Sequence, residues 1–312
     1  DGSTVAGSFG VTVVDDVPTA NDDGGYQVEE GSNVITGNVM ANDVAGADGA
    51  QVTGLTYTDE NGQSATLAVP ATGTVTADTQ YGSITIDAAG NWTYTSDPSV
   101  NASGTVQDVI GYTITDGDGD TSSANLTVEI GDGVPTIGYP GGDPNVAAPT
   151  VSVDEDDLAG GSDGSDPTTV NQPLAINFGE DGPAQDGAVT FSATQSGLTG
   201  LTSGGQPVVV TVSADGLTVT GTVGGSPVFT ATITDDGNGG YGYQFQLQGE
   251  LDQAPGAGEN ATNLSFGIVA KDADGSTVAG SFGVTVVDDV PTANDDGGYQ
   301  VEEGSNVITG NV

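Results

Sequence analysis

Short runs in which apolar and polar residues alternate are the dominant pattern along this 312-residue chain. Every second residue is apolar in ANLTVEI at 124–130 and in YGYQFQLQ at 241–248. A period of two predicts strands with one buried face. Turn signals such as Asn61-Gly62 and Asp215-Gly216 separate these runs, at intervals of roughly 8–12 residues. No stretch sustains a helical apolar period, so we expect an all-β protein.

An internal repeat defines the organisation of the chain. Residues 1–39 recur without change at 274–312, an offset of 273 residues. No physical constraint demands identity at solvent-exposed positions, so the repeat indicates recent duplication of a 273-residue unit in a longer tandem array. The chain is interpreted as one full period plus 39 further residues.

A second, weaker sequence similarity divides the 273-residue repeat into two parts. VVDDVPTAN at 13–21 resembles IGDGVPTIG at 130–138, and in both a carboxylate and Val-Pro end an alternating apolar run. Proline cannot continue the ladder, so each position predicts a strand exit and a linker. The predicted domains are the last strand of a preceding repeat at 1–16, a β-sandwich at 17–134, a larger β-sandwich at 135–289 and the start of the next repeat at 290–312.

These domains are expected to be immunoglobulin-like or cadherin-like β-sandwiches, joined end to end by short acidic linkers. A parallel β-roll is the rival for a chain rich in Gly and Asp, but its tandem G-G-x-G-x-D nonapeptides are absent from the sequence. We expect the two ends to be poorly packed unless neighbouring molecules complete them, which would produce end-to-end association of an otherwise monomeric chain.

Composition narrows the possible functions. The formal net charge is −43, from 44 Asp plus Glu against one Lys or Arg, and there is no His or Cys. Disulfides, thiolate or imidazole metal sites and Ser-His or Cys-His nucleophiles are therefore excluded. A single cation, Lys271, leaves no basic patch for nucleic acid or for an anionic membrane surface. No apolar run reaches the ~18 residues of a membrane span.

The sharpest chemical feature is Asp116-Gly117-Asp118-Gly119-Asp120, which lies between the last two predicted strands of the first domain. Alternate carboxylates separated by glycines can converge on Ca²⁺, which takes 6–8 oxygen ligands at roughly 2.3–2.6 Å, whereas Mg²⁺ keeps its waters. The second domain has a counterpart in Asp272-Ala273-Asp274, before its final strand. The alternative for both is a solvated turn chosen for the conformational tolerance of Asp and Gly.

Sandwich geometry places these loops beside the linkers. The loop before the last strand lies at the end of the domain where its first strand begins. We therefore expect the first loop to lie beside the carboxylates of the incoming linker, which are Asp15, Asp16, Asp22 and Asp23. By the same logic Asp272 and Asp274 should lie beside Asp132 and Asp143. Several Ca²⁺ per chain would then clamp the domain junctions.

The other acidic runs and Trp92 each have a functional and a purely structural interpretation. The run 154–157 is a further site or a charged loop, and 235–239 is expected to be a plain hairpin turn. Trp92 alternates with Tyr94 on one strand face, which favours core packing over a sugar platform. No acid is singled out as a glycosidase pair, so we expect no enzyme.

The order of three segments carries a resemblance to known families. GNVMANDVAGADG (37–49), YGSITIDAAGNWTYT (81–95) and IGYTITDGDGDTSS (110–123) resemble successive blocks of the VCBS and cadherin-like repeats of bacterial surface proteins. LAINFGEDGPAQDG (174–187), DGNGGYGYQFQLQG (236–249) and the stretch 266–293 resemble repeats of giant adhesins of the RTX type.

The resemblance implies a structural extender secreted by the type I route to a bacterial cell surface. There it would project a distal domain that binds the ligand for adhesion and biofilm formation, with flanking repeats as its neighbours. The implied Ca²⁺ ligands are Asp116, Asp118, Asp120, Asp272 and Asp274, together with linker residues Asp15, Asp16, Asp132, Asp288 and Asp289. Gly133 stands where the first linker has a second Asp, which predicts a weaker site there. The alternative function is a Ca²⁺-dependent module that binds carbohydrate or another cell.

Overall fold

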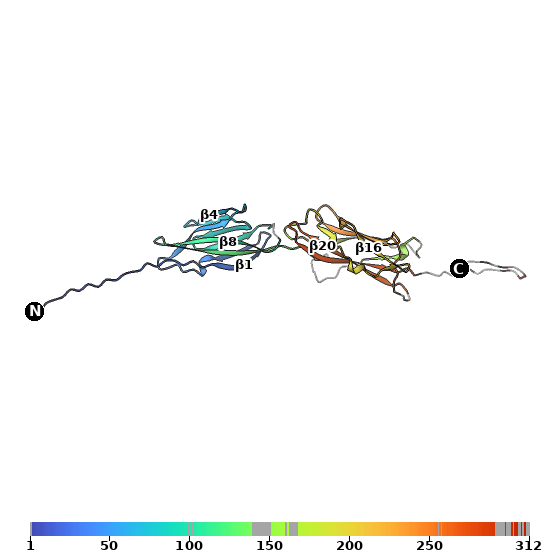
Figure 1. Ribbon diagram of the computed structural model, residues 1–312, viewed down its shortest axis with the longest axis horizontal. Coiled ribbons are helices and arrows are strands. Elements are labelled where there is room, and N and C mark those ends of the chain that lie inside the picture. Colours follow the sequence, from blue (N-terminus) through green and yellow to red (C-terminus); the bar gives the residue numbers. More distant parts are fainter. Residues whose placement is uncertain are drawn as a thin grey trace. The chain divides into compact units, whose positions relative to one another are not determined.

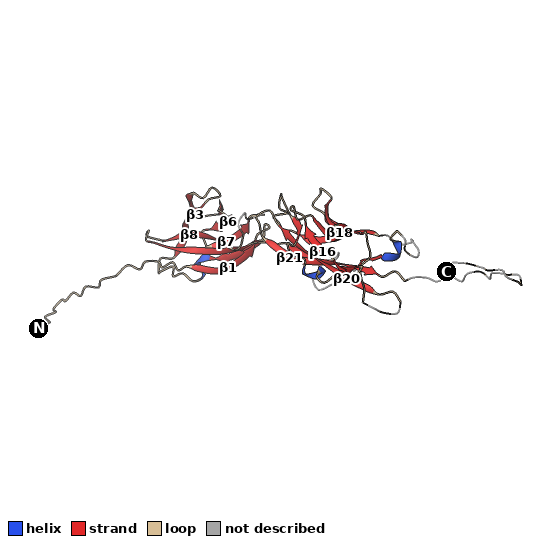
Figure 2. Cartoon of the chain, turned by 45° about the vertical axis from the view of Figure 1, so that its right-hand side comes forward, coloured by secondary structure: helices blue, strands red, loops and turns tan. Residues whose placement is uncertain are grey.

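The computed structural model describes residues 2–98, 100, 103–138, 151–159, 161, 168–254, 256, 258–290 and a few isolated positions beyond 290. Figures 1 and 2 show that its regular structure is almost entirely β. The chain forms two compact units. Unit 1 comprises Asp1–Pro135, Phe178–Ala184 and Asp272–Ser276, and unit 2 comprises Thr136–Asn177, Gln185–Lys271 and Thr277–Val312. No helix in the part of the chain described above has the length and hydrophobicity to span a membrane.

Unit 1 is a sandwich of a five-stranded sheet, in the order β1-β9-β8-β3-β4, and a four-stranded sheet, in the order β2-β7-β6-β5. The strands are β1 (Asp23–Glu29), β2 (Val34–Asn38), β3 (Ala50–Thr58), β4 (Ser64–Ala68), β5 (Thr74–Asp78), β6 (Gly82–Asp87), β7 (Asn91–Ser96), β8 (Val106–Asp116) and β9 (Thr121–Gly131), and a single 3-10 turn, η1 (Val39–Ala41), follows β2. A turn containing Gly31 and Ser32, both at positive φ, separates β1 from β2 and moves the chain from one sheet to the other.

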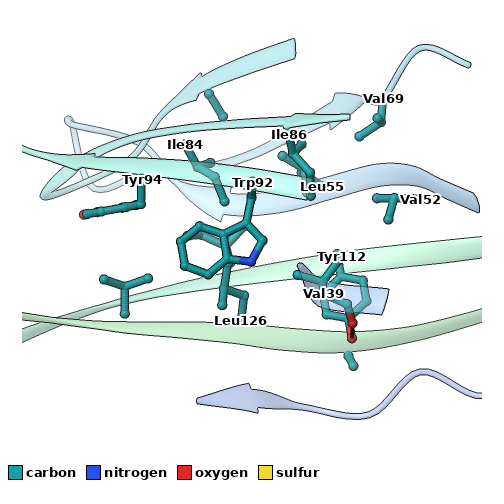
Figure 3. Close-up of a cluster of buried hydrophobic side chains, with 14 of the residues drawn as sticks. Val39, Val52, Leu55, Val69, Ile84, Ile86, Trp92, Tyr94, Tyr112 and Leu126 are labelled. Atoms are coloured by element: carbon teal, nitrogen blue, oxygen red, sulfur yellow. Dashed lines mark hydrogen bonds between the residues drawn. The ribbon is translucent and has the colours of Figure 1, made fainter. Parts of the chain in front are cut away.

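Side chains from both sheets fill the core of unit 1. Figure 3 shows Trp92 and Tyr94 of β7 among aliphatic residues such as Ile84 and Leu126. Trp92 is 2% exposed and meets the ring of Tyr26 edge-on at a centroid distance of 4.8 Å. The expectation that Trp92 packs in a core is confirmed, as is the strand over 124–130, whose apolar residues are all buried.

Unit 2 pairs a six-stranded sheet, in the order β10-β12-β19-β18-β17-β16, with a four-stranded sheet, in the order β11-β21-β20-β13, and has the small hairpin β14-β15. The strands are β10 (Thr136–Gly138), β11 (Val151–Asp154), β12 (Thr169–Asn177), β13 (Val189–Phe191), β14 (Thr202–Ser203), β15 (Gln206–Pro207), β16 (Val209–Val212), β17 (Thr218–Val223), β18 (Ser226–Asp235), β19 (Tyr241–Leu247), β20 (Ala261–Lys271) and β21 (Thr277–Val287), with 3-10 turns η2 (Glu155–Asp157) and η3 (Ser196–Leu198). Phe229 and Phe245 on one sheet pack against Phe266 on the other. The predicted all-β sandwich architecture is therefore observed in both units.

In both units the last strand is paired in parallel with an early strand, which is the first strand of unit 1 and the second strand of unit 2. β1 pairs with β9, and β11 pairs with β21, whereas the other ladders between strands are antiparallel. Parallel neighbours end at the same edge of the sheet, so the residue after β1 lies beside the residue after β9, and the residue after β11 lies beside the residue after β21. Because β9 has 11 residues at roughly 3.3 Å each, the hairpin before it and the residues after it lie at opposite ends of the sandwich.

One sequence adopts two conformations. Thr277–Val287 forms β21 between β11 and β20, whereas the identical residues 4–14 form no strand and expose their apolar side chains. Val5 is 95% exposed and Phe9 is 89% exposed, but Phe282, which has the place of Phe9 in the repeat, is 4% exposed. Among the described residues the slot between β11 and β20 is already filled by β21. Strand formation here depends on an available partner, because the ladder supplies the backbone hydrogen bonds.

The close approach of Gly37 to Trp92 gives a test of the core. A Cβ built on Gly37 would lie 2.5 Å from the indole Cζ2, whereas one on Gly54 would meet nothing closer than 3.8 Å. Overpacking a filled core costs about 1–3 kcal/mol. We expect Gly37→Ala to lower the free energy of unfolding of unit 1 by this amount and Gly54→Ala to leave it nearly unchanged.

The measurement is urea unfolding followed by tryptophan fluorescence. Trp92 is the chain's one Trp, so the signal reports unit 1 alone. Equal unfolding midpoints for the two variants would show that the indole is not confined by Gly37.

Candidate metal centre

The hairpin between β8 and β9 is closed by its own first carboxylate. Asp116 Oδ1 accepts hydrogen bonds from the backbone N–H of Gly119 (3.0 Å) and of Asp120 (2.7 Å). Gly119 has φ 111°, which a residue with a Cβ rarely adopts. Asp116 is buried, and its second oxygen, Oδ2, is buried without a hydrogen-bond partner. One face of this carboxylate is therefore fixed by the protein and the other is left for a ligand.

Five carboxylates gather around this hairpin, and we call them cluster A. Oxygens of Asp116, Asp118 and Asp120 lie within 4.8 Å of one another, and oxygens of Asp15, Asp48 and Asp118 form a second such group. The backbone oxygen of Asp48 would lie 3.2 Å from a Cβ on Gly117, so glycine at this position lets the Asp48 loop come close. The predicted grouping of Asp15 with the hairpin is present, and Asp48 is a member that the sequence did not suggest.

Mutual repulsion is visible in the pKa values of cluster A. A hydrogen bond shared with Asp116 raises the pKa of Asp118 to about 6, and the charges of Asp116, Asp15 and Asp120 contribute to the rise. Burial and the charges of Asp116 and Asp15 also raise the pKa of Asp120. Asp118 and Asp120 therefore hold protons more readily than isolated carboxylates when no cation is beside them.

The remaining predicted residues of the first linker bond to the sandwich. Asp16 Oδ2 accepts from the N–H of Ala47 at 2.9 Å, and Asp22 Oδ1 accepts from the N–H of Asn125 at 2.8 Å. Asp23 Oδ2 accepts from the Tyr112 hydroxyl at 3.1 Å, and burial raises the pKa of Asp23 to about 6. None of the three belongs to a convergent group of the described acidic residues.

The hairpin between β20 and β21 repeats the local geometry of the first. Asp272 Oδ1 accepts from the N–H of Gly275 at 3.0 Å, and Gly275 has φ 109°. The Asp272 N–H donates to Ser276 O at 3.1 Å, as the Asp116 N–H donates to Asp120 O at 3.1 Å. Asp272 is 0% exposed, and its Oδ2 is buried without a partner. The sequence likeness between the two hairpins therefore reflects a common structure.

Within unit 1 this hairpin belongs to a second group, which we call cluster B: Glu30, Asp132, Asp181, Asp272 and Asp274. Oxygens of the first three lie within 4.8 Å of one another, and so do those of the last three. Buried oxygens without a hydrogen-bond partner are Asp132 Oδ1, Asp181 Oδ2, Asp272 Oδ2 and Asp274 Oδ2. Burial, with a hydrogen bond to Glu30 and the neighbouring charges, raises the pKa of Asp181 to about 7.

The position of Glu30 follows from the parallel strand pair. It comes directly after β1, beside the end of β9, and is 2% exposed. Its Oε1 accepts from the N–H of Gly133 at 2.8 Å and its Oε2 from the N–H of Val100 at 2.6 Å. Asp132, which follows β9, accepts from the Ser276 hydroxyl at 2.8 Å through Oδ2.

Calcium fits the donor set of both clusters. All the side chains that converge are carboxylates, and five buried carboxylate oxygens in them lack a hydrogen-bond partner. Buried charges without partners are costly, and a hard cation that prefers oxygen ligands would compensate them. Asp15, Asp48, Asp116, Asp118 and Asp120 would hold an ion in cluster A, and the five members of cluster B would hold another. Asp143, which was expected near Asp272, lies outside the described residues.

Unit 2 has its own equivalent of Glu30. Glu155 follows β11, which is parallel to β21, and it is 3% exposed. Its Oε1 accepts from the N–H of Leu251 at 2.8 Å and from Gln253 Nε2 at 2.9 Å. Of the two acids after β21, Asp289 has a buried Oδ1 without a partner, and the Asp288 N–H donates to Asn260 O. Neither is in a convergent group of the described residues.

The two other acidic runs have local roles. Asp154 caps η2 by accepting from the N–H of Asp156. Asp236 Oδ1 accepts from the N–H of Asn238 and of Gly240, which closes the β18–β19 connection as a plain hairpin turn. Three cluster members were not among the predicted site residues: Glu30, Asp48 and Asp181. The sequence signal was weak for the last two, because each precedes a glycine, a dipeptide typical of any turn.

Comparison with known proteins finds a family match within the first unit. Residues 15–132 match the family of the bacterial cadherin-like domain. This segment holds all the members of cluster A, and Glu30 and Asp132 of cluster B. The chain as a whole matches no curated protein.

Several solved cadherin structures also resemble the chain. Mouse clustered PcdhgC3 EC1-3 is 12% identical with a TM-score of 0.22, mouse Cadherin-23 EC22-24 is 13% identical with 0.25, and Drosophila N-cadherin EC1-4 is 11% identical with 0.25. Each match covers 88% of this chain and, respectively, 68%, 65% and 50% of the solved chain. At these identities and TM-scores the likeness supports no functional inference.

Glu155 makes the stability of unit 2 depend on pH. Burial raises its pKa from the ordinary 4.5 to about 7. The folded state then binds a proton that the unfolded state releases, so this contribution to stability is complete below about pH 4.5 and is lost as the pH rises through about 7. We expect Glu155→Gln to remove this decline, because an amide oxygen can accept the same two hydrogen bonds.

The measurement is thermal unfolding by circular dichroism between pH 5 and pH 8, taking the transition that is not accompanied by a change in Trp92 fluorescence. Glu259→Gln, an exposed neutral substitution in the same unit, is the control. A Glu155→Gln protein that loses as much stability with rising pH as the parent would contradict the assignment.

Proposed function

We propose that the chain is a structural spacer of a bacterial cell-surface adhesin, stiffened by Ca²⁺ bound at clusters A and B. The observation that carries the proposal is the set of four buried, unpartnered carboxylate oxygens in cluster B. They come from the end of β9, from the segment Phe178–Ala184 and from the β20–β21 hairpin. An ion there would tie the linker after β9 to two loops that are continuous in sequence with strands of unit 2.

The tandem repeat supports a spacer over a catalyst. The 39 identical residues at an offset of 273 indicate that a whole unit has been duplicated. Repeating a unit makes a rod longer, whereas an active site gains nothing from such repetition. Secretion by the type I route, membership of an RTX adhesin and a role in biofilm formation are parts of the same proposal. They rest on the sequence resemblance and on the cadherin-like match over residues 15–132.

Small-angle scattering tests the stiffening. We expect the pair-distance profile of the chain to broaden when a chelator removes Ca²⁺ and to recover when millimolar Ca²⁺ is restored. Mg²⁺ at the same concentration should not substitute, because it demands near-octahedral geometry and retains its waters. Superimposable profiles with and without chelator would rule out the clamp.

Asp132→Asn gives the matched mutational test. The substitution keeps the shape of the side chain but removes one of the charges of cluster B, so its scattering in Ca²⁺ should resemble that of the parent in chelator. Asp215→Asn is the control, since Asp215 lies in the exposed turn between β16 and β17 and bonds Ser213. An Asp132→Asn profile like that of the control would place the clamp elsewhere.

A second candidate function is favoured by the surroundings of cluster A. Asp15, Asp48 and Asp118 are exposed, and a cleft of about 390 Å³ lined by Asp48, Gln51, Thr53 and Asp116 adjoins them. An ion held by exposed carboxylates keeps positions for outside oxygens, and the amide and hydroxyl groups suit a sugar. Calcium-dependent binding of the chain to a glycan array, lost in Asp48→Asn, would support this function, and no binding in Ca²⁺ would reject it.

A further inference from the structure

Clusters A and B have the same number of carboxylates but differ in how firmly these are held. In cluster B, four of the five accept hydrogen bonds from backbone N–H groups: Glu30, Asp132, Asp272 and Asp274. Asp132 Oδ2 is held from two sides, by the Gly104 N–H at 2.9 Å and by the Ser276 hydroxyl at 2.8 Å. A cation entering cluster B therefore meets ligands that are already oriented.

Cluster A is organised mainly by one residue. Asp116 accepts two N–H groups of its hairpin, but Asp118 and Asp48 are exposed. Asp15 lies in a segment without regular structure, and its Oδ1 accepts from the adjacent N–H of Asp16 at 3.2 Å. Binding a cation here has to order exposed side chains, which costs conformational entropy.

The two clusters also differ in how far their carboxylates are exposed to solvent. Cluster B contributes four buried oxygens without a partner and cluster A contributes one, Asp116 Oδ2. Two members of cluster B, Glu30 and Asp272, are at least nine-tenths buried, so their charges repel in a poorly screened environment. A divalent cation relieves more repulsion in cluster B than in cluster A, where water already screens the exposed carboxylates.

We infer that Ca²⁺ fills cluster B at a concentration at least tenfold lower than cluster A. This inference rests on the proposed calcium-dependent function and adds its regulation. At calcium levels between the two affinities, the linker after β9 is clamped while the linker around Asp15 remains free. Ligand rigidity is one of the properties by which proteins tune calcium affinity over several orders of magnitude.

The inference reverses the expectation from sequence that the linker with Gly133 has the weaker site. Gly133 does remove a carboxylate, but its N–H donates to Glu30 Oε1 and helps to orient that side chain. A Cβ at this position would lie 2.6 Å from the same oxygen. Glu30 and Asp181 supply the charge that the linker lacks.

Two equivalent amides report the clusters separately in the intact chain. Gly119 N–H bonds Asp116 Oδ1 in cluster A, and Gly275 N–H bonds Asp272 Oδ1 in cluster B, each at 3.0 Å. ¹H–¹⁵N NMR spectra of the chain are recorded in calcium buffers of rising free Ca²⁺. We expect the Gly275 resonance to reach its bound position at least tenfold earlier than that of Gly119.

Matched variants assign the two transitions. Asp181→Asn should raise the Gly275 midpoint at least tenfold and leave that of Gly119 unchanged, and Asp48→Asn should have the opposite selectivity. Both residues lie outside the hairpins that are observed, and Asp215→Asn should change neither midpoint. If Asp181→Asn does not fold, as judged by Trp92 fluorescence, the order of the two midpoints in the parent chain still decides the question.

The outcomes distinguish a wrong order of calcium filling from a wrong proposed function. Coincident midpoints, or Gly119 responding first, would overturn the order of filling and leave a calcium-binding spacer intact. If neither resonance moved at millimolar Ca²⁺, both the order and the proposed function would be wrong.

Discussion

Repulsion between buried carboxylates is the constraint on which the ends of unit 1 depend. Asp272 is fully buried, Glu30 is nearly so, and both face other acids in a chain whose one cationic side chain is Lys271. Folding could reduce the cost by protonation, and the raised pKa values of Asp181 and Asp272 show that tendency. Near neutral pH a divalent cation is the stronger solution, because it compensates several charges at once and also uses the oxygens that lack hydrogen bonds.

The strand topology creates this constraint. Because β1 and β9 are parallel neighbours, the acid after each is brought to the same edge of one sheet, and Glu30 comes close to Asp132. An antiparallel first strand would place them at opposite ends. The same arrangement of β11 and β21 puts Glu155 at the corresponding edge of unit 2, where it is bonded by a loop instead of facing a described carboxylate cluster. A buried acid after the strand that pairs in parallel with the last strand is thus common to both sandwiches.

The sequence predicted much of the fold and part of each cluster. Alternating apolar residues identified β9 and β19, and the two Asp-x-Asp hairpins were recognised because their residues are adjacent in the chain. Asp48 and Asp181 were missed because tertiary contacts alone bring them there. Asp22 and Asp23 were expected in cluster A, yet bonds to Asn125 and Tyr112 hold them on the sandwich. Residues 4–14 show the limit most plainly, since they have the sequence of β21 without its structure.

Most of the large negative charge of the chain does not belong to the candidate metal clusters. Ten of the 44 acidic residues belong to clusters A and B, so the majority remain solvated whether or not cations bind. Two divalent ions would neutralise about four charges, which leaves a chain that repels its neighbours and stays soluble. The near absence of Lys and Arg has a more specific effect, because it leaves the clustered carboxylates without internal counterions. What distinguishes these ten acids is that their oxygens converge, and five of them keep a buried oxygen without a hydrogen-bond partner. The total charge of the chain reveals neither property.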